Sequence, residues 1–269
     1  MTETSSPSSL SQRGPVAERR SRLSAALREA GYLSIGDLAR LVDVSEMTVR
    51  RDLDHLATTG PIERTHGGAV YKGAGQPMGF DRDEPALEER IRKNAEAKWA
   101  IARAAHAMVA PGKTLALDIG STALCLADRL RDEEVRIFTY SLRIAEHLAR
   151  HRARTYLPGG ELRGSEPSLV GPIAREQLHR FRFDFFFLGA SGISPQGFFD
   201  YSLDDSEIKQ TLLARSAHRV ALLDSSKFDR LSNMRIGDLS IVDTLVTDQP
   251  PPAALEASLA EAGVSLCLA

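Results

Sequence analysis

Cysteine is scarce in this chain, and its placement excludes several classes of site. The 269 residues include only Cys125 and Cys267. They do not form the close pair that structural metal sites and redox motifs require. A disulfide between them is possible but has no support in the sequence, and the reducing cytoplasm fits better. We therefore expect a cytoplasmic protein with two buried apolar thiols, no metal site and no cofactor.

Long apolar runs are also missing. No run approaches the ~20 residues of a membrane span. The first residues, MTETSSPSSLSQRGP, lack the apolar core of a signal peptide. Their serine and proline content predicts a disordered tail over residues 1–15. We therefore expect no membrane partner.

Positive charge is not in excess, so composition does not indicate nucleic acid. The formal net charge is -2. Even residues 15–72 carry nine Lys or Arg against eight Asp or Glu. Any DNA-binding interpretation must therefore depend on where the charges lie rather than on how many there are.

The sequence does contain an ordered set of helix and turn signals near its start. Helical patterns cover Val16–Ala30, a short segment capped by Ser34, and a third segment that ends at Gly60-Pro61. Two strand patterns, Ile62–Thr65 and Ala69–Tyr71, bracket His66-Gly67-Gly68. Three helices followed by a hairpin predict a small winged helix-turn-helix over residues 16–72.

The third helical segment has the properties of a DNA-recognition helix. Ser45 is a suitable N-cap. Apolar residues at helical spacing predict a buried stripe formed by Val44, Val49, Leu53 and Leu56. Polar and cationic residues near the helix start fall largely on the other side, at Met47, Thr48, Arg50 and Arg51. Such side chains are suited to phosphates and base edges in a major groove.

Residues 73–85 are rich in glycine, proline and charge, and predict a linker. A long helix is expected over Ala86–Val109. Beyond it, apolar runs predict strands at Thr114–Leu117, Val135–Thr139, Ala153–Leu157, Asp184–Leu188, Arg219–Leu223 and Thr244–Thr247. Helical patterns between them are Thr122–Leu130, Leu142–Arg150, Pro172–His179 and Ser206–Ser216. This alternation predicts an α/β domain with a largely parallel sheet over residues 86–269.

Small and polar residues follow five of the predicted strands, where parallel sheets bind ligands. The segments are Asp118–Thr122, Thr139–Ser141, Pro158–Gly160, Gly189–Gly192 and Asp224–Lys227. The first combines a glycine, two hydroxyls and the free N–H groups of a helix start, all suited to phosphate. The last adds the compact cation of Lys227. Together they predict a pocket for a phosphorylated polyol.

These motifs, in this order, resemble the DeoR family of bacterial transcriptional repressors over residues 16–269. The family pattern S-x-x-T-[IV]-R-R-D-L matches Ser45–Leu53, and R-x-H-G-G-A matches Arg64–Ala69. Its sensor motifs D-x-G-[ST]-T, G-G, G-x-x-G-[IV] and D-x-S-K resemble the strand-end segments above. Within the family, FRFDFFFLGASGI (Phe181–Ile193) and TDQPPP (Thr247–Pro252) are closest to the glycerol-3-phosphate repressors.

The resemblance implies an operator-binding repressor whose sensor domain has a pentose-phosphate-isomerase-like fold. Glycerol 3-phosphate is the expected effector, and another sugar phosphate is the alternative. The implied DNA-binding residues are Ser45, Met47, Thr48, Arg50, Arg51, Arg64, His66 and Gly67. The implied effector-binding residues are Asp118, Gly120, Ser121, Thr122, Ser141, Gly159, Gly160 and Lys227. The family commonly has Asn where this chain has Tyr140, so the contact of that Asn side chain is not carried over.

Other interpretations remain open. Arg50 and Arg51 could form a solvated face paired with Asp52 and Asp54. His147 and His151, four residues apart, could bind a metal, although they lack a third ligand. Asp118 with Lys227 could act in a sugar-phosphate isomerase, with Glu207 and Lys209 nearby. The attached winged helix instead favours a non-enzymatic sensor, a homodimer or homotetramer, with the helix over Ala86–Val109 as transmitter.

Overall fold

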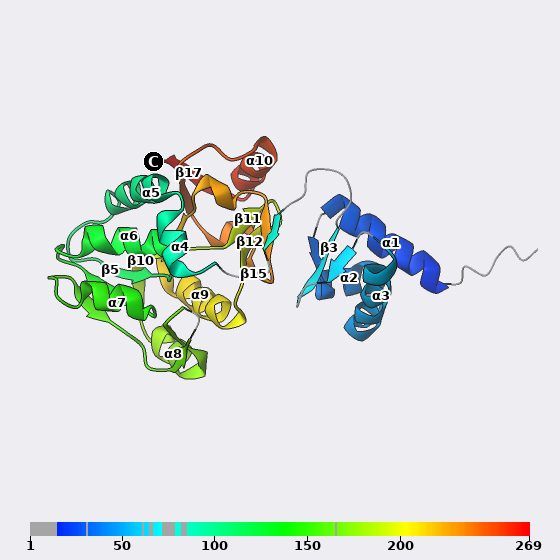
Figure 1. The fold of residues 1–269 in the computed structure, drawn as a ribbon, viewed down its shortest axis with the longest axis horizontal. Coiled ribbons are helices and arrows are strands. Elements are labelled where there is room, and N and C mark those ends of the chain that lie inside the picture. Colours follow the sequence, from blue (N-terminus) through cyan, green and yellow to red (C-terminus); the bar gives the residue numbers. More distant parts are fainter. Residues whose placement is uncertain are drawn as a thin grey trace, which may run out of the picture. The chain divides into compact units, whose positions relative to one another are not determined.

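A computed structural model of the chain describes residues 15–30, 32–60, 62–64, 67–71, 79–81, 85–164 and 166–269. The chain divides into two compact units, Met1–Pro77 and Met78–Ala269 (Figure 1). Except for Pro15, the predicted tail lies outside the described residues. The two units are considered one at a time.

The first unit is a winged helix-turn-helix, as predicted. Its helices are α1 (Pro15–Ala30), α2 (Ile35–Val42) and α3 (Glu46–Thr59). Its strands are β1 (Tyr32–Ser34), β2 (Ile62–Arg64) and β3 (Gly68–Tyr71), in the antiparallel order β1-β3-β2. The expected two-stranded hairpin is therefore extended by β1. Gly68 makes this possible, because a Cβ there would lie 2.2 Å from the carbonyl oxygen of Leu33.

Helix α3 is held by one apolar stripe and one buried carboxylate. Val49 and Leu53 are fully buried against α1 and α2, and Val44 and Leu56 pack at the edge of the same cluster. Asp52 is also buried, where it accepts hydrogen bonds from Arg19 and Arg20, each at 2.7 Å. These two hydrogen bonds hold the pKa of Asp52 below its usual value against the opposing effect of burial. The carboxylate thus fixes α3 to α1.

The second unit is built on a seven-stranded parallel sheet with the order β17-β16-β13-β10-β5-β6-β7. The strands are β5 (Thr114–Leu117), β6 (Arg136–Thr139), β7 (Arg154–Tyr156), β10 (Phe183–Leu188), β13 (Ser216–Leu222), β16 (Thr244–Thr247) and β17 (Ser265–Leu268). Six of these were predicted, and β17 was not. The strand order reverses between β5 and β10, and this reversal is where ligands bind in such sheets.

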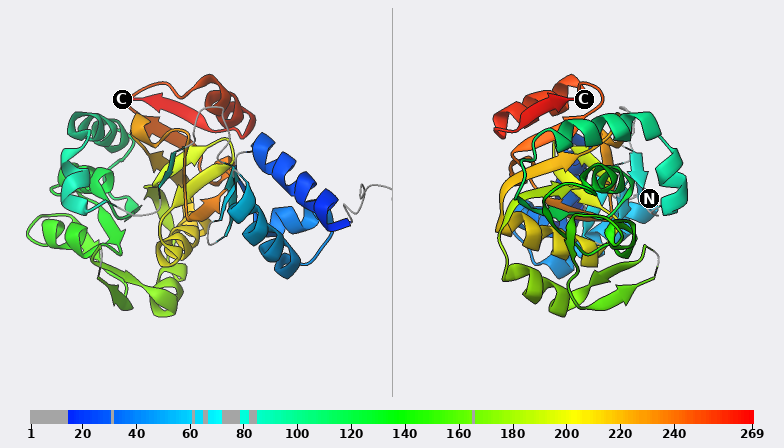
Figure 2. Two further views of the ribbon diagram at one scale, coloured as in Figure 1. Left: turned by 45° about the vertical axis from the view of Figure 1, so that its right-hand side comes forward. Right: turned by 90° about the vertical axis from the view of Figure 1, so that its left-hand side faces the viewer.

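Helices cover both faces of this sheet (Figure 2). On one face lie α5 (Ala95–His106), α6 (Ser121–Leu130) and α7 (Leu142–Leu148); on the other lie α8 (Gly171–His179), α9 (Leu203–Arg215) and α10 (Ala253–Glu261). Side chains alternate along each strand. Leu115 and Leu117 therefore face the first group of helices, whereas Ala116 faces the second.

Shorter strands surround the carboxyl edge of the sheet. An antiparallel hairpin is formed by β8 (Glu161–Arg163) and β9 (Ser168–Val170). A three-stranded sheet is formed by β11 (Gly192–Ser194), β12 (Gly197–Asp200) and β15 (Met234–Gly237). β4 (Gly79–Asp81) pairs in parallel with β14 (Arg230–Ser232). β4 lies within the stretch that the sequence indicates as a linker.

The prediction of one long helix over Ala86–Val109 is wrong. The segment forms α4 (Leu87–Arg92) and α5, separated at Lys93-Asn94. Asn94 adopts the left-handed conformation, with φ 53°, and its amide donates to Asp224 at 2.9 Å. The buried Lys98 ammonium donates to the carbonyl oxygens of Arg90 and Lys93, which the break frees. Side chains thus replace the lost helical hydrogen bonds.

Two smaller expectations are also corrected. α9 begins at Leu203, three residues before the predicted start, because the Ser202 hydroxyl accepts from the Asp205 N–H and caps it. Cys125 in α6 and Cys267 in β17 are free but only partly buried, and both pack against the core between the sheet and α5, α6 and α7. Among the described residues, no helix has the length and apolar character that a membrane crossing needs.

Candidate DNA-binding and effector-binding sites

The start of α3 presents an exposed polar and cationic surface. The Ser45 hydroxyl accepts from the Thr48 N–H at 3.4 Å and lies 3.0 Å from the Thr48 hydroxyl. Met47 is 60% exposed, and Arg50 and Arg51 are exposed as well. Capping thus fixes the helix start while the remaining side chains stay accessible to a groove.

The charges around α3 leave one arginine uncommitted. Arg50 lies 3.7 Å from Glu46 one turn earlier. Arg51 makes no ion pair or hydrogen bond with any described residue. Asp52 is occupied by α1, and Asp54 forms an ion pair with Arg64 of β2. The alternative in which Asp52 and Asp54 neutralise Arg50 and Arg51 is therefore wrong.

The wing is described in part. Arg64 is held by its ion pair with Asp54, which ties β2 to α3. The carbonyl oxygen of Gly67 accepts from the Ile35 N–H at 2.9 Å and so anchors the hairpin to α2. His66 lies outside the described residues.

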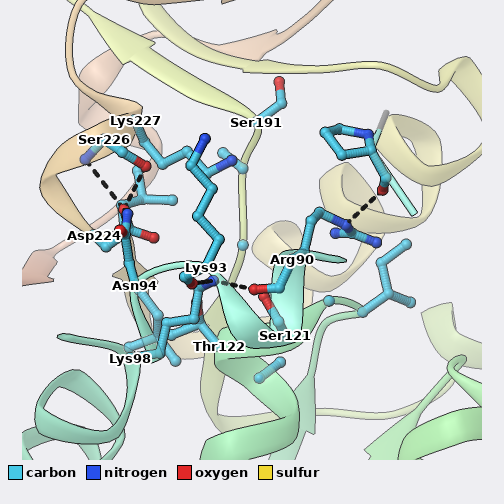
Figure 3. A pocket seen from close by; sticks show the side chains of 18 of the residues that line it. Arg90, Lys93, Asn94, Lys98, Ser121, Thr122, Ser191, Asp224, Ser226 and Lys227 are labelled. Atoms are coloured by element: carbon cyan, nitrogen blue, oxygen red, sulfur yellow. Dashed lines mark hydrogen bonds between the residues drawn. The ribbon is translucent and has the colours of Figure 1, made fainter. Parts of the chain in front are cut away.

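In the second unit, a cavity opens at the carboxyl ends of β5, β10 and β13, beside the reversal of strand order (Figure 3). Its lining contains six cationic side chains and three carboxylates. The cations are Arg90, Lys93, Lys98, Lys209, Lys227 and Arg230, and the carboxylates are Glu89, Asp200 and Asp224. This excess of positive charge in a concave site favours an anionic ligand.

Helix α6 directs its start into this cavity. Gly120, Ser121 and Thr122 all line it. Gly120 has φ 101°, which favours glycine, and a Cβ there would lie 3.5 Å from Nη1 of Arg90. The free N–H groups of the first turn, two hydroxyls and a guanidinium therefore converge. Such a combination binds phosphate.

The loop after β13 adds a second polar wall. Asp224 accepts from Asn94 and from the N–H of Ser226, so it connects this loop to the α4–α5 break. Lys227 and Lys93 both extend into the cavity (Figure 3). Burial and the neighbouring cations Arg90, Arg230 and Lys98 lower the pKa of Lys227. A bound anion would relieve this repulsion.

Sequence reasoning missed the cavity residues contributed by α4 and α5. Arg90, Lys93, Asn94 and Lys98 reach the site only because the helix breaks at Asn94. A helix pattern drawn straight through this segment hides the break. The signal available in the sequence was Asn94, because asparagine tolerates left-handed backbone. It follows Lys93 and precedes Lys98.

Asp118 does not face the ligand space directly. It is fully buried and accepts from four donors: the N–H of Ile119 at 2.8 Å, the N–H of Gly189 at 2.7 Å, the Tyr140 hydroxyl, and the Lys209 ammonium at 3.2 Å. It therefore joins the ends of β5 and β10 at the strand reversal. Tyr140 uses its hydroxyl for this network.

Lys209 is the centre of the same network. Its ammonium is buried, contacts Asp118 and Asp200, and donates to the carbonyl oxygen of Gly189 at 3.0 Å. Although burial opposes the charge, these carboxylates raise the pKa of Lys209. The ammonium therefore stays charged. The isomerase interpretation pairs Asp118 with Lys227, whereas in the structure Asp118 pairs with Lys209.

Besides Asp118, three predicted effector residues do not line this cavity. Ser141 is buried as the cap of α7 and accepts from the Ile144 N–H at 3.2 Å. The Gly159 N–H donates to Gln177, and Gly160 lies against β9. The strand order explains the separation, because β6 and β7 lie on the side of β5 that faces away from β10 and β13.

His147 and His151 each contact a different carboxylate, Asp128 at 2.9 Å and Asp132 at 3.3 Å. Within the described parts of the chain, no three His, Cys, Asp or Glu side chains gather as a metal would need.

Comparison with known proteins gives the family. Residues 19–73 match the DeoR-like helix-turn-helix domain, and residues 93–249 match the DeoR C terminal sensor domain. The glycerol-3-phosphate regulon repressor of Escherichia coli (strain K12) is 32% identical, over 89% of this chain and 94% of that protein. The HTH-type transcriptional repressor CsqR of the same strain is 32% identical, over 93% and 94%.

Two further proteins are similar to this chain. The L-fucose operon activator of Escherichia coli (strain K12) is 34% identical, over 79% of this chain and 86% of that protein. The structure of ribose 5-phosphate isomerase A from Methanocaldococcus jannaschii can be superposed over 51% of this chain and 55% of the isomerase chain, with 18% sequence identity and a TM-score of 0.38. On the family models and the near full-length relatives, the chain belongs to the DeoR family of transcriptional regulators.

Proposed function

We propose that this protein is a sequence-specific repressor of a sugar or polyol catabolic operon, released from its operator by a phosphorylated polyol. Glycerol 3-phosphate is the first candidate. The observation that carries the effector class is the cation-rich cavity at the strand reversal, with the start of α6 opening into it. A phosphate fits these donors, and small polar groups around it suit a hydroxylated body.

The proposed DNA contacts lie at the start of α3. Arg51 has no competing partner among the described residues, so we assign it to a base edge or a phosphate. Arg50 is only loosely paired with Glu46. Arg64 must leave its ion pair with Asp54 in order to contact DNA. Thr48, Met47 and Gly67 complete the proposed surface.

Release requires that the effector favour one conformation over another, because a ligand with equal affinity for both would shift nothing. α4 is the first described helix after the winged helix in sequence, and it carries Arg90 into the phosphate site. We therefore propose that the position of α4 depends on the effector, in place of the single transmitter helix expected over Ala86–Val109.

The test begins with an operator selected by the full-length protein from random-sequence DNA. Glycerol 3-phosphate, other sugar phosphates and inorganic phosphate are then titrated into the complex. Release by glycerol 3-phosphate at the lowest concentration supports the full proposal. Release by a hexose or pentose phosphate alone would keep the class and reject glycerol 3-phosphate. If the protein selects no DNA sequence, the repressor assignment fails.

An isomerase assay on the same sugar phosphates separates the enzyme alternative. Asp118 already accepts three hydrogen bonds and forms an ion pair with Lys209, so it is poorly suited to accept a substrate proton. We therefore expect no turnover.

A further inference from the structure

Three buried polar atoms near the β8–β9 hairpin have no hydrogen-bond partner among the described residues. They are Oε1 of Glu166, Oγ of Ser168 and Oδ1 of Asp205. The three side chains are 2%, 0% and 1% exposed. Buried polar groups are nearly always paired, and an unpaired one costs free energy. Three together indicate groups kept available for a ligand.

Contacts within the fold link the residues that carry these atoms. Ser168 faces Arg163 across the hairpin, and Glu166 lies in the turn between them. The Arg163 guanidinium forms an ion pair with Oδ2 of Asp205, in the first turn of α9. Ser168 also pairs with Ser141 through a backbone bridge. The two hairpin strands and α9 are thus linked to one another beside the three atoms.

The same site borders the phosphate-binding cavity. Oε2 of Glu166 forms an ion pair with Arg90, which lines the cavity beside Gly120. One guanidinium therefore separates the free oxygen of Glu166 from the start of α6. The carboxylate of Asp205 also interacts electrostatically with Lys209, another lining residue.

We infer that Glu166, Ser168 and Asp205 form a hydroxyl-binding subsite for the polyol part of the effector. The inference rests on the proposed function, and it assigns to this subsite the hydroxylated body of a ligand whose phosphate lies at Arg90 and α6. Free carboxylate oxygens accept hydrogen bonds from hydroxyls, and the Ser168 hydroxyl both donates and accepts. An apolar group would leave the three atoms unpaired.

Such a subsite gives selectivity, because a site built to pair with hydroxyls rejects an analogue that lacks them. The selectivity is measured by titration calorimetry with the full-length protein. Glycerol 3-phosphate and ribose 5-phosphate serve as hydroxylated probes, and methyl phosphate serves as the hydroxyl-free probe. We expect the wild-type protein to bind at least one hydroxylated probe about ten-fold or more tightly than it binds methyl phosphate. The affinity for that probe divided by the affinity for methyl phosphate is the affinity ratio.

Glu166→Gln and Asp205→Asn should each reduce this affinity ratio by about ten-fold, while Asp205→Asn leaves methyl phosphate binding nearly unchanged. Asp204→Asn is the matched control, because Asp204 is the exposed neighbour in the same helical turn. It should leave the ratio unchanged. Ser168→Ala removes an atom without a partner and so tests the site even if a carboxylate variant fails to fold. It should lower the ratio several-fold.

An equal loss for hydroxylated and hydroxyl-free probes in all three variants would overturn the subsite and make these residues supports for Arg90. Wild type that binds methyl phosphate as tightly as both hydroxylated probes would overturn it as well, while leaving a phosphate site in place. Failure of every phosphate to bind would overturn the proposed effector class together with the subsite.

Discussion

Two cations of the cavity, Lys98 and Lys227, have lowered pKa values, so their charge is held in an unfavourable environment that an anion would relieve. Lys227 illustrates this, since burial and three neighbouring cations lower its pKa while Asp224 only partly compensates. The free energy of that repulsion is recovered when a phosphate enters. Cations of this kind therefore contribute to ligand affinity rather than to the stability of the free protein.

Lys227→Ala should consequently weaken effector binding while leaving operator binding intact. Loss of a charge-assisted hydrogen bond costs about 1.5–3 kcal/mol, so affinity should fall about ten-fold or more. Lys113→Ala is the control, because Lys113 pairs with Asp184 at the amino end of β5. Calorimetry with the effector and a gel-shift assay without it measure the two properties. Normal effector affinity in Lys227→Ala would place the phosphate elsewhere.

Arg51 is the most informative residue of the DNA surface, since no described partner competes for it. Arg51→Ala should weaken operator binding by about 1–3 kcal/mol and relax specificity at one base if it reads a base edge. If it holds a phosphate, all sequences should lose affinity and the salt slope should shrink by about one. Arg180→Ala, which breaks a surface pair with Glu176, is the control. An unchanged operator affinity would contradict both assignments.

Asp205 should make stability depend on pH. Burial raises its pKa from 3.8 to about 7, with Asp200 and Asp118 adding to the rise and Lys209 and Arg163 opposing it. Between these values the folded state binds more protons than the unfolded state, so stability falls as pH rises from about 4 to about 7 and then levels off. Denaturant unfolding at several pH values should show this fall reduced in Asp205→Asn and kept in Asp204→Asn.

At the scale of elements, the α4–α5 break decides what the cavity contains. A continuous helix would carry Arg90 and Lys93 along a straight axis. The left-handed Asn94 and its bond to Asp224 instead turn α4 toward the loop after β13. The break thus brings Arg90 and Lys93 to the proposed effector site and is a suitable place for a conformational response.

Asn94→Ala should destabilise the second unit by about 1–2 kcal/mol. Alanine is strained in the left-handed conformation, and it cannot make the hydrogen bond to Asp224. Asn94→Gly should cost less, because glycine adopts this conformation freely. Both should weaken effector binding, which calorimetry measures beside denaturant unfolding. Full effector affinity in both variants would mean that the break does not position Arg90 and Lys93.

At the scale of the whole molecule, one winged helix reads too few base pairs for a specific operator. We therefore predict a homodimer or homotetramer that binds an inverted repeat. Sedimentation analysis of the protein with its selected operator, and footprinting, measure both properties. A single protein copy on a footprint without internal symmetry would contradict this prediction.

Local signals were sufficient for much of the fold. The Ser45 cap, the Val49–Leu53 stripe and the strand patterns were readable because each depends on neighbours within a few residues. β17 was missed because its strand character comes from pairing with β16 rather than from its own pattern. The break at Asn94 was missed because the contacts that stabilise it, above all Asp224, are distant in sequence.

The sequence by itself determined the family, the winged helix and the parallel α/β sheet, and it singled out Gly120–Thr122 and Lys227, which line the cavity, since motif chemistry and hydrophobic period are local. Only the tertiary structure decided which strand ends share a cavity. Strand order, set by long-range packing, gathers the ends of β5, β10 and β13 and separates Ser141, Gly159 and Gly160 from them. It likewise gathers Glu166, Ser168 and Asp205, because burial and pairing are properties of neighbours in space.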